Sequence, residues 1–435
     1  MHEAHAATAW ARNDLTLITR NPPRLLYLLI QFIDSKIDGG LDSTFFSFLR
    51  IFTFIEFRAV LAMIVAFAVV VLSGKRVIRW LVTQKIGDNP EFHNKDINEL
   101  MKSKANTPTM GGVMIVGAIV LVTLLLADIS RQNGFYVWMG LVCLVAMASI
   151  GMADDWLKLT TARRKPGSRD GLRSWEKLMF QLGLAVLLGI FVYHHGVSKF
   201  SAPDEQHVQL MSQSLNLPGL KTWVYNVAEG AWMPSQNLII LPGVVFVILA
   251  VLFIAGTSNA VNLTDGMDGL AGGITLIVAF AFLVLCLIAG YERGDFILAQ
   301  YLLVPHIPFA DELAVLAGAM AGACLGFLWF NCHPAQVFMG DTGSLALGGT
   351  LGYLAIVTRQ ELLLLIIGGV FFFEMLSVIL QVGSFKLRGG KRIFKCAPVH
   401  HHFHMVGWTE QQVVVRFWLI TVLLAAIALS TIKLR

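Results

Sequence analysis

A short polar stretch between two apolar runs has the residue types that bind metal ions and phosphates. The stretch at 259–269 reads Asn-Ala-Val-Asn-Leu-Thr-Asp-Gly-Met-Asp-Gly, and the runs are 238–256 and 270–290. Two amides and two carboxylates recur every three residues, so a helical turn would place them on one face. They are Asn259, Asn262, Asp265 and Asp268. The alternative is a plain polar loop with a helix cap, but such a loop needs no acid repeated at fixed spacing.

Two further segments carry acids beside the ends of apolar runs. Asp154 and Asp155 are adjacent, and Lys158 follows Asp154 at i+4, where the two side chains share a helical face. Asp341 lies in Phe-Met-Gly-Asp-Thr-Gly-Ser, where it caps a helix or completes a metal site. These carboxylates are hard oxygen ligands, and Mg²⁺ is usually bound by one or two carboxylates together with waters and substrate phosphates. The acids therefore predict magnesium-assisted phosphoryl transfer at a membrane surface.

Three more segments suit anionic ligands. Pro108 and the glycines that follow it in 102–112 predict a stiff turn with free backbone donors, or an ordinary start of a helix. The basic stretch 163–173 suits anionic headgroups, or simply marks the cytoplasmic side. Three consecutive histidines in 397–404 would diverge on a loop, so imidazoles beside phosphates are more natural there than a zinc site.

The composition predicts an all-α integral membrane protein. Of its 435 residues, 56% are hydrophobic and 14% are charged, well below the quarter typical of a soluble domain. The apolar runs are long and continuous, unlike the alternating strands of a membrane barrel. Residues 1–56 are expected to form an N-terminal extension with interfacial helices, and 57–435 a bundle of ten transmembrane helices. The predicted spans are 57–74, 111–127, 136–153, 175–193, 238–256, 270–290, 312–330, 343–358, 361–383 and 414–432.

Charge asymmetry predicts which side of the membrane carries the polar segments. Most of the 33 Lys and Arg fall on the side that holds the loops with the acids and the histidines. That side is therefore expected to be cytoplasmic. The longest loop on the other side, 196–237, is expected to contain a small hairpin. Glu374 lies inside the ninth predicted span, either as a functional group or as a paired acid that joins helices. The sequence carries no nucleic-acid motif, so no nucleic-acid partner is expected.

Five motifs together resemble those of the phospho-N-acetylmuramoyl-pentapeptide transferase family, from about residue 57 to the C-terminus. They are Thr-Pro-Thr-Met-Gly-Gly, Asp-Asp-x-x-Lys, Asn-Leu-Thr-Asp-Gly-Met-Asp-Gly, Phe-Met-Gly-Asp-Thr-Gly-Ser and Ala-Pro-Val-His-His-His-Phe. The resemblance implies ten spans, a homodimer in the bacterial inner membrane and an active site that faces the cytoplasm. The implied reaction moves phospho-N-acetylmuramoyl-pentapeptide from its UDP carrier to undecaprenyl phosphate, with Mg²⁺ as cofactor, and releases UMP.

The resemblance also implies roles for individual residues. Asp154 resembles the acid that deprotonates the lipid phosphate, Asp341 the magnesium ligand, and Asp155 and Asp265 its catalytic neighbours, with Lys158 in the same motif. The remaining implied positions are the uridine-pocket residues Lys104, Asn331, Phe338 and Asp268, the ribose and phosphate neighbours Thr109 and Asn262, and the histidine cluster His400, His401 and His402.

The sequence departs from the family pattern in three places, and two other classes of protein remain open. The stretch 88–106 and the N-terminal extension 1–56 are longer than usual, and His404 stands where the family has Glu.

A relative that transfers N-acetylglucosamine-1-phosphate would share the aspartates but have a different histidine segment. A transporter would place its acids near the midplane of broken helices, whereas here they cluster at one interface.

Overall fold

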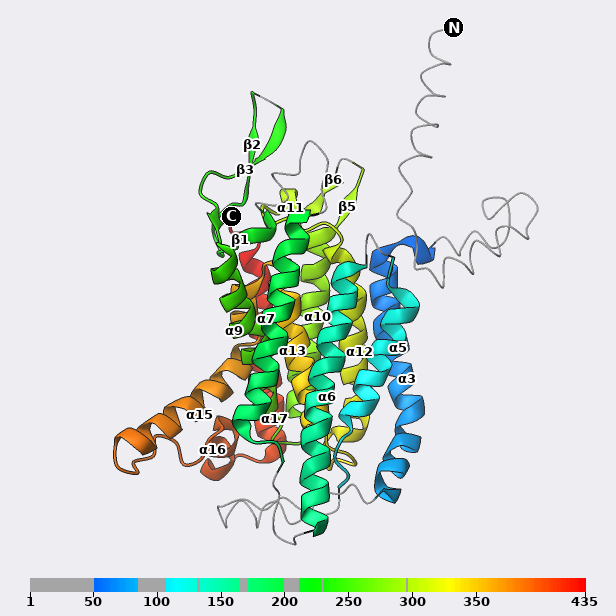
Figure 1. Cartoon of the computed structure of the whole chain (residues 1–435), viewed down its shortest axis with the longest axis vertical. Helices are drawn as coiled ribbons and strands as arrows, with labels where there is room; N and C mark the ends of the chain where they lie inside the picture. Colours follow the sequence, from blue (N-terminus) through cyan, green and yellow to red (C-terminus); the bar gives the residue numbers. More distant parts are fainter. Residues whose placement is uncertain are drawn as a thin grey trace, which may run out of the picture.

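Long apolar helices run side by side and make up most of the chain (Figure 1). The computed structural model describes residues 51–84, 107–130, 134–164, 171–198, 211–228, 230–294 and 296–435. The predicted interfacial helices of the N-terminal extension lie almost entirely outside the described residues. The helices are α3 (Ile55–Thr83), α5 (Gly112–Leu126), α6 (Phe135–Arg164), α7 (Ser174–Ser198), α9 (Gly243–Thr264), α10 (Leu270–Gly290), α11 (Leu298–Tyr301), α12 (Leu313–Asn331), α13 (Gly340–Thr358), α14 (Glu361–Ile367), α15 (Gly369–Leu387), α16 (Val399–Val406) and α17 (Glu410–Thr431), with a 3₁₀ turn η4 (Ala310–Glu312).

Eight of the described helices are long and apolar enough to cross a membrane, and the chain is therefore a multi-pass membrane protein. They are α3, α6, α7, α9, α10, α12 with its preceding 3₁₀ turn, α15 and α17. Each of the ten predicted spans overlaps a helix, but α5 has only 15 residues, or roughly 22 Å at about 1.5 Å per residue. The count of ten spans remains a prediction.

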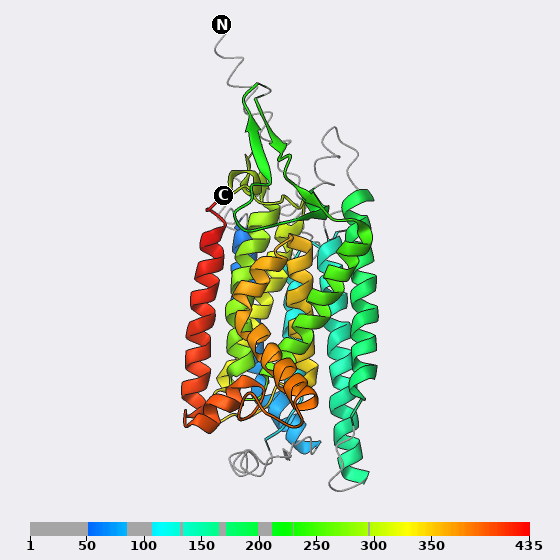
Figure 2. The ribbon, with the colours of Figure 1, turned by 90° about the vertical axis from the view of Figure 1, so that its left-hand side faces the viewer.

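The ninth predicted span is wrong as a single helix. Residues 361–383 form α14 and α15, which meet at Gly368. The adjacent Gly368 and Gly369 lower the local helix propensity, which explains why the helix breaks there. After the break, α15 leans away from the bundle and carries α16 beside it (Figures 1 and 2). This break brings Glu374 close to the histidine segment, as described below.

The centre of the bundle is formed by α12 and α13. The side chains of α12 are almost all buried, and the helix packs chiefly against α3 and α10. Helix α13 packs chiefly against α9 and α6. Small residues permit this close packing: a Cβ on Gly322 would lie 1.9 Å from the Met63 carbonyl oxygen of α3. Gly322 therefore lies at a close contact between α12 and α3.

Three short antiparallel strand pairs lie at one end of the bundle. The predicted hairpin in 196–237 is confirmed as β2 (Trp223–Asn226) paired with β3 (Ala231–Pro234). The other pairs are β1 (Ser214–Leu215) with β4 (Ile239–Ile240), and β5 (Glu292–Arg293) with β6 (Phe296–Ile297).

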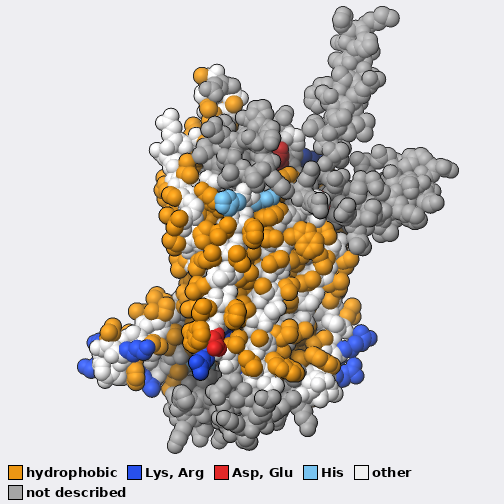
Figure 3. Space-filling view, viewed as in Figure 1, with side chains coloured by type: hydrophobic (Ala, Val, Ile, Leu, Met, Phe, Trp, Pro, Cys, Tyr) orange, Lys and Arg blue, Asp and Glu red, His pale blue; other side chains and the backbone are white. Residues whose placement is uncertain are grey.

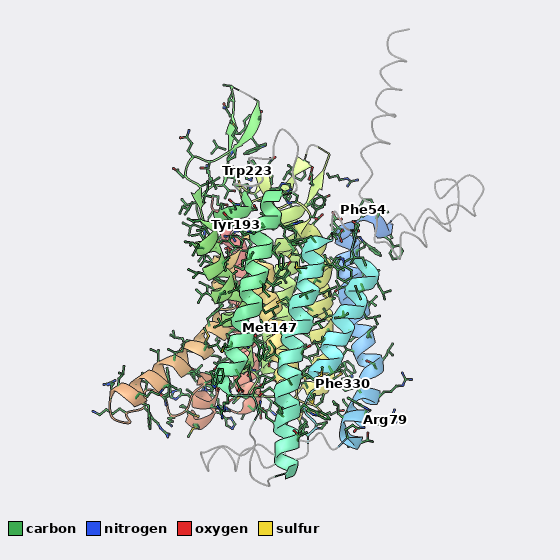
Figure 4. All side chains as sticks on the ribbon, in the orientation of Figure 1. Phe54, Arg79, Met147, Tyr193, Trp223 and Phe330 are labelled. Carbon is green, nitrogen blue, oxygen red and sulfur yellow. The ribbon has the colours of Figure 1, made fainter. Side chains whose placement is uncertain are left out.

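The two ends of the bundle differ in chemistry. Apolar side chains cover the middle of the face in Figure 3, and Lys and Arg gather mainly at the end where α15 leans out. Figure 4 marks that end by Arg79 and Phe330, and the hairpin end by Trp223 and Tyr193. The helix ends that carry the predicted site residues therefore lie at the more basic end.

Candidate active site

Four helices bring residues from distant parts of the chain to one cluster at the basic end of the bundle. The side chains come from the C-terminal part of α6, the first turn of α7, the end of α9 and the first turn of α13. They are Asp154, Asp155 and Lys158 of α6, Lys177 of α7, Asn262 and Asp265 at the end of α9, and Asp341 and Thr342 of α13.

Two lysines lie between two carboxylates. Lys158 Nζ is 2.7 Å from Asp154 Oδ2 and 3.1 Å from Asp341 Oδ2. Lys177 Nζ is 2.8 Å from Asp154 Oδ2 and also pairs with Asp341 Oδ2. The predicted i, i+4 contact of Asp154 with Lys158 is confirmed. Both ammonium groups are hydrogen-bond donors placed among acids, an arrangement that can bind phosphate oxygens without leaving a lone buried charge.

Asp341 is held ionised by this arrangement. Burial by itself raises the pKa of its carboxyl, but a hydrogen bond with Asp154 and the charges of Lys158 and Lys177 hold that pKa well below its usual range. The Asn262 amide donates to Asp341 Oδ1 at 3.0 Å, as its predicted place near the site requires. Asp341 therefore offers an anionic oxygen ligand at any physiological pH.

Asp155 joins α6 to the start of α13. Its carboxylate accepts the backbone N–H of Asp341 at 3.2 Å and of Thr342 at 3.0 Å, and the Thr342 hydroxyl at 2.7 Å. An anion at a helix N-terminus satisfies donors that have no partner within the helix. Gly340 has φ +73°, and a Cβ there would lie 2.8 Å from Asp155 Oδ2, so this contact needs glycine. In this arrangement Asp155 fixes the position of Asp341.

The repeated acids after α9 do not share one helical face, so that prediction is wrong. Helix α9 ends at Thr264, which leaves Asp265 as its C-cap and Asp268 in the turn beyond. Asn259 points to α7, where its amide donates to Gln181 Oε1 at 2.6 Å. Asp265 remains beside the cluster: burial, together with Asp341 and Asp155, raises the pKa of its carboxyl to about 7 against a hydrogen bond from the Gly340 backbone.

The Thr-Pro-Thr-Met-Gly-Gly turn is clamped to the segment before α13. The Phe338 backbone N–H donates to the Pro108 carbonyl at 2.8 Å. Gly111 N–H donates in return to the Phe338 carbonyl at 2.8 Å, and Gly112 N–H to the Met339 carbonyl at 2.9 Å. The prediction that these glycines present free backbone donors is therefore wrong. The clamp instead holds Thr109 and the half-buried Phe338 next to Gly340.

Asn331 and Asp268 lie together beside this clamp. Asn331 donates to the Val337 carbonyl at 2.8 Å and accepts Gly269 N–H at 3.0 Å. Asp268 Oδ2 lies 3.1 Å from His333 Nδ1, and Glu410 Oε1 accepts the Asp268 backbone N–H at 2.9 Å. Lys104, the other predicted pocket residue, lies outside the described residues.

Asp268, His333 and Glu410 also form a group that could hold a metal ion, because one ligand atom from each lies within 4.8 Å of the others. However, Asp268 Oδ2 already faces His333 and accepts the backbone N–H of Ala335 at 3.2 Å. A metal ion there would have to displace these contacts.

The three histidines lie on α16, so their assignment to a loop is wrong. The helix begins after Pro398, whose ring is compatible with the position before a first helical turn. His400 and His401 are buried, with ring centroids 4.2 Å apart. His402 turns elsewhere and accepts the Lys395 backbone N–H at Nδ1. His400 and His401 therefore lie together, while His402 makes separate contacts; a joint role for the three histidines remains a prediction.

The sequence reasoning missed Lys177, Thr342, His333 and Glu410. Lys177 carried the clearest signal, because it is a charged residue within the first turn of the predicted span 175–193. Thr342 follows Asp341 directly and could have been read as a helix N-terminal partner. His333 and Glu410 carried no local signal, since only the fold brings them to Asp268.

Comparison with known proteins places this fold and cluster in a class. The model of glycosyl transferase family 4 matches residues 137–359, which include every described helix that contributes to the acidic cluster. The phospho-N-acetylmuramoyl-pentapeptide-transferase signature 1 matches residues 104–116, the segment that forms the clamped turn.

Curated relatives define the particular family. Phospho-N-acetylmuramoyl-pentapeptide-transferases of Citrifermentans bemidjiense and of Geobacter sp. strain M21 are each 43% identical over 391 residues, which cover 89% of this chain and 96% of theirs. The one of Thermodesulfovibrio yellowstonii is 41% identical over 398 residues, covering 90% and 98%. The chain belongs to the phospho-N-acetylmuramoyl-pentapeptide-transferase family.

Proposed function

We propose that the chain transfers phospho-N-acetylmuramoyl-pentapeptide from UDP-N-acetylmuramoyl-pentapeptide to undecaprenyl phosphate, giving lipid I and UMP in peptidoglycan synthesis. The observation that carries the proposal is the cluster in which Lys158 and Lys177 lie between Asp154 and Asp341 at one end of a membrane bundle. Both substrates carry phosphates, and the lipid substrate is confined to the bilayer. A cluster of this charge pattern at a helix-bundle end meets both requirements.

The donor set suits Mg²⁺, because its candidate ligands, Asp341 and Asp265, offer hard carboxylate oxygens. Asp341 would hold the ion, with Asp265 as its neighbour. When bound, the ion would neutralise charge on the transferring phosphate. The lysines supply part of the same charge neutralisation from the chain itself.

The chain's own residues account for a direct transfer. Asp154 accepts the proton of the lipid phosphate, and a lipid phosphate oxygen forms a bond to the phosphorus that bears the sugar. The pyrophosphate P–O bond breaks and UMP leaves with the electron pair. Lys158 and Lys177 orient the phosphates, and positioning supplies most of the acceleration because the lipid phosphate is already an anionic nucleophile. A two-step route would instead make an aspartate the nucleophile.

The nucleotide is proposed to bind beside this cluster. Phe338 would stack on the uracil, with Asn331, Asp268 and Lys104 around it. The closeness of Phe338, Asn331 and Asp268 to the turn at 107–112 supports this arrangement.

The remaining proposals concern the whole chain. Residues 57–435 are proposed as the transferase domain, with 1–56 as an extension. The protein is proposed to form a homodimer in the bacterial inner membrane with the cluster facing the cytoplasm. The gathering of Lys and Arg at the end that carries the cluster supports this orientation.

A UMP-release assay tests the proposal. The full chain, purified in detergent with Mg²⁺ and undecaprenyl phosphate, should release UMP from UDP-N-acetylmuramoyl-pentapeptide. Asp154→Asn should slow the release, and the loss should shrink at high pH, where the lipid phosphate is already a dianion. Absence of UMP release by the unchanged protein would contradict the proposed function.

A further inference from the structure

A buried acid on α15 faces a buried histidine on α16. Glu374 and His400 are both fully buried, and Glu374 Oε2 lies 3.1 Å from His400 Nδ1. The backbone N–H of His400 donates to the same oxygen at 3.4 Å. The backbone N–H and the ring Nδ1 of His400 therefore both face one carboxylate oxygen.

The other edge of the imidazole faces the turn after α9. A Cβ on Gly266 would lie 2.3 Å from His400 Nε2, so this nitrogen packs directly against the backbone next to Asp265. His400 Nε2 is buried and has no hydrogen-bond partner, whereas Nδ1 meets Glu374 Oε2 as a close charge contact and not as a well-aligned hydrogen bond. A buried polar atom without a partner is costly, and this one lies against the turn that follows Asp265.

A carboxylate at Nδ1 fixes both the orientation and the tautomer of a histidine. With Nδ1–H donated to the acid, Nε2 keeps its lone pair and can accept a hydrogen bond or a proton. Glu374 would be expensive to bury for packing alone, because an apolar residue of similar volume would fill the same space without desolvating a charge.

We propose that Glu374 is a positioning residue that holds His400 with Nε2 directed at the Asp265–Gly266 turn. This inference rests on the proposed function, because His400 can act on a substrate only if the site carries out the proposed transfer. It also explains why an acid is retained within the membrane part of α15.

Kinetics of Glu374 variants test the proposal. Glu374→Gln can place its amide oxygen where Oε2 lies. The backbone N–H and the Nδ1–H of His400 both face that position and favour the oxygen over the amide nitrogen. Glu374→Asp keeps the charge, but its side chain is one methylene shorter, so the carboxylate lies farther from His400. We expect Glu374→Gln to retain most of kcat and Glu374→Asp to lose about 10-fold or more, with KM for the UDP-sugar within about twofold of the unchanged protein.

A double-mutant cycle with His400→Ala separates positioning from a structural role. In the His400→Ala background, Glu374→Asp should cost less than about twofold in kcat, because the group it positions is gone. Equal losses in both backgrounds, or a Glu374→Gln variant that is slower than Glu374→Asp, would overturn the proposal.

A matched control uses another fully buried acid. Glu361 pairs with Arg359 at 2.7 Å, far from the cluster, so Glu361→Gln should lower the melting temperature and leave kcat unchanged. Lack of turnover by the unchanged protein would contradict the proposed function. If the unchanged protein turns over but the kcat losses of Glu374→Asp and His400→Ala are additive, only the proposed role of Glu374 is contradicted.

Discussion

Lys158 and Lys177 determine what the acidic residues around them can do. Each ammonium contacts both Asp154 and Asp341, so neither carboxylate is left as an isolated buried charge. The motif Asp-Asp-x-x-Lys was sufficient to predict Lys158. The charge of Lys177 inside a predicted span was a signal, but its partners could not be predicted, because the contact depends on α7 beginning beside α6, which no local pattern encodes.

Removing the charge of Asp341 should remove the metal dependence together with the activity. Asp341→Asn keeps the shape but loses the anionic oxygen, so we expect turnover below about 1% of that of the unchanged protein, as for loss of an essential charged group. A chelator should likewise stop UMP release by the unchanged protein, and added Mg²⁺ should restore it. Full activity in the chelator would contradict the metal assignment.

Asp265 should make the Mg²⁺ requirement depend on pH. Its carboxyl has a pKa of about 7, so it is protonated below that pH and must release a proton before it accompanies a cation. The Mg²⁺ concentration for half-maximal UMP release should fall as pH rises to about 7 and then level off. Asp265→Asn should abolish this pH dependence of the Mg²⁺ requirement. The same pH dependence in that variant would show that the titrating group is not Asp265.

The same pKa shift has a consequence for stability. Because the folded-state pKa is raised, the folded protein binds the proton more tightly than the unfolded chain does. The contribution of Asp265 to the free energy of unfolding is therefore fully present below about pH 4 and is lost as pH rises through about 7.

Phe338 should contribute to nucleotide affinity by stacking. Phe338→Ala should weaken UDP-sugar binding by ~1–3 kcal/mol, the usual worth of a base stacked on an aromatic ring. Titration calorimetry of the detergent-solubilised protein would measure this. Phe296→Ala is the control, because Phe296 is exposed in β6 at the other end of the bundle. Equal affinity in Phe338→Ala and the unchanged protein would remove Phe338 from the pocket.

At the scale of elements, apolar run lengths predicted the helices well and their polar ends poorly. The run 270–290 coincides with α10, since the Gly269 turn and the break after Gly290 bound it sharply. Helix α9 extends through the polar residues to Thr264. The side chains of Asn259 and Thr264 donate to backbone carbonyls one turn earlier, so these polar residues fit within the helix. The histidines are helical as well, and the contact of His400 with Glu374 joins this short helix to α15.

The close contact of α12 with α3 should tolerate no added methyl group at Gly322. Its Cβ would meet backbone atoms of Met63, so the helices must separate, and we expect Gly322→Ala to destabilise the protein by about 1–3 kcal/mol. A thermal unfolding scan in detergent measures the change. Gly117→Ala is the control, since its Cβ meets nothing within 4 Å and should leave the melting temperature unchanged or slightly higher. Equal melting temperatures for the two variants would contradict the packing.

At the scale of the whole molecule, the sequence was sufficient to predict a membrane bundle with its chemistry at one end. Charge asymmetry and the positions of the acids relative to the apolar runs carry that information. The mutual arrangement of the helices could not be predicted, because packing of small residues such as Gly322 and Gly348 against backbone carbonyls is specific to the fold. The grouping of Asp268, His333 and Glu410 depends on that arrangement.

The central claim is the choice of sugar donor, and a competition assay tests it most directly. The purified chain, given undecaprenyl phosphate, Mg²⁺ and equal amounts of UDP-N-acetylmuramoyl-pentapeptide and UDP-N-acetylglucosamine, would have its lipid products identified by mass spectrometry. We expect undecaprenyl diphosphate bearing N-acetylmuramoyl-pentapeptide to dominate, because a pocket built for the larger donor gains transition-state binding from its remote groups. A product bearing N-acetylglucosamine as the main species would contradict the account, even though the fold and the acidic cluster would stand.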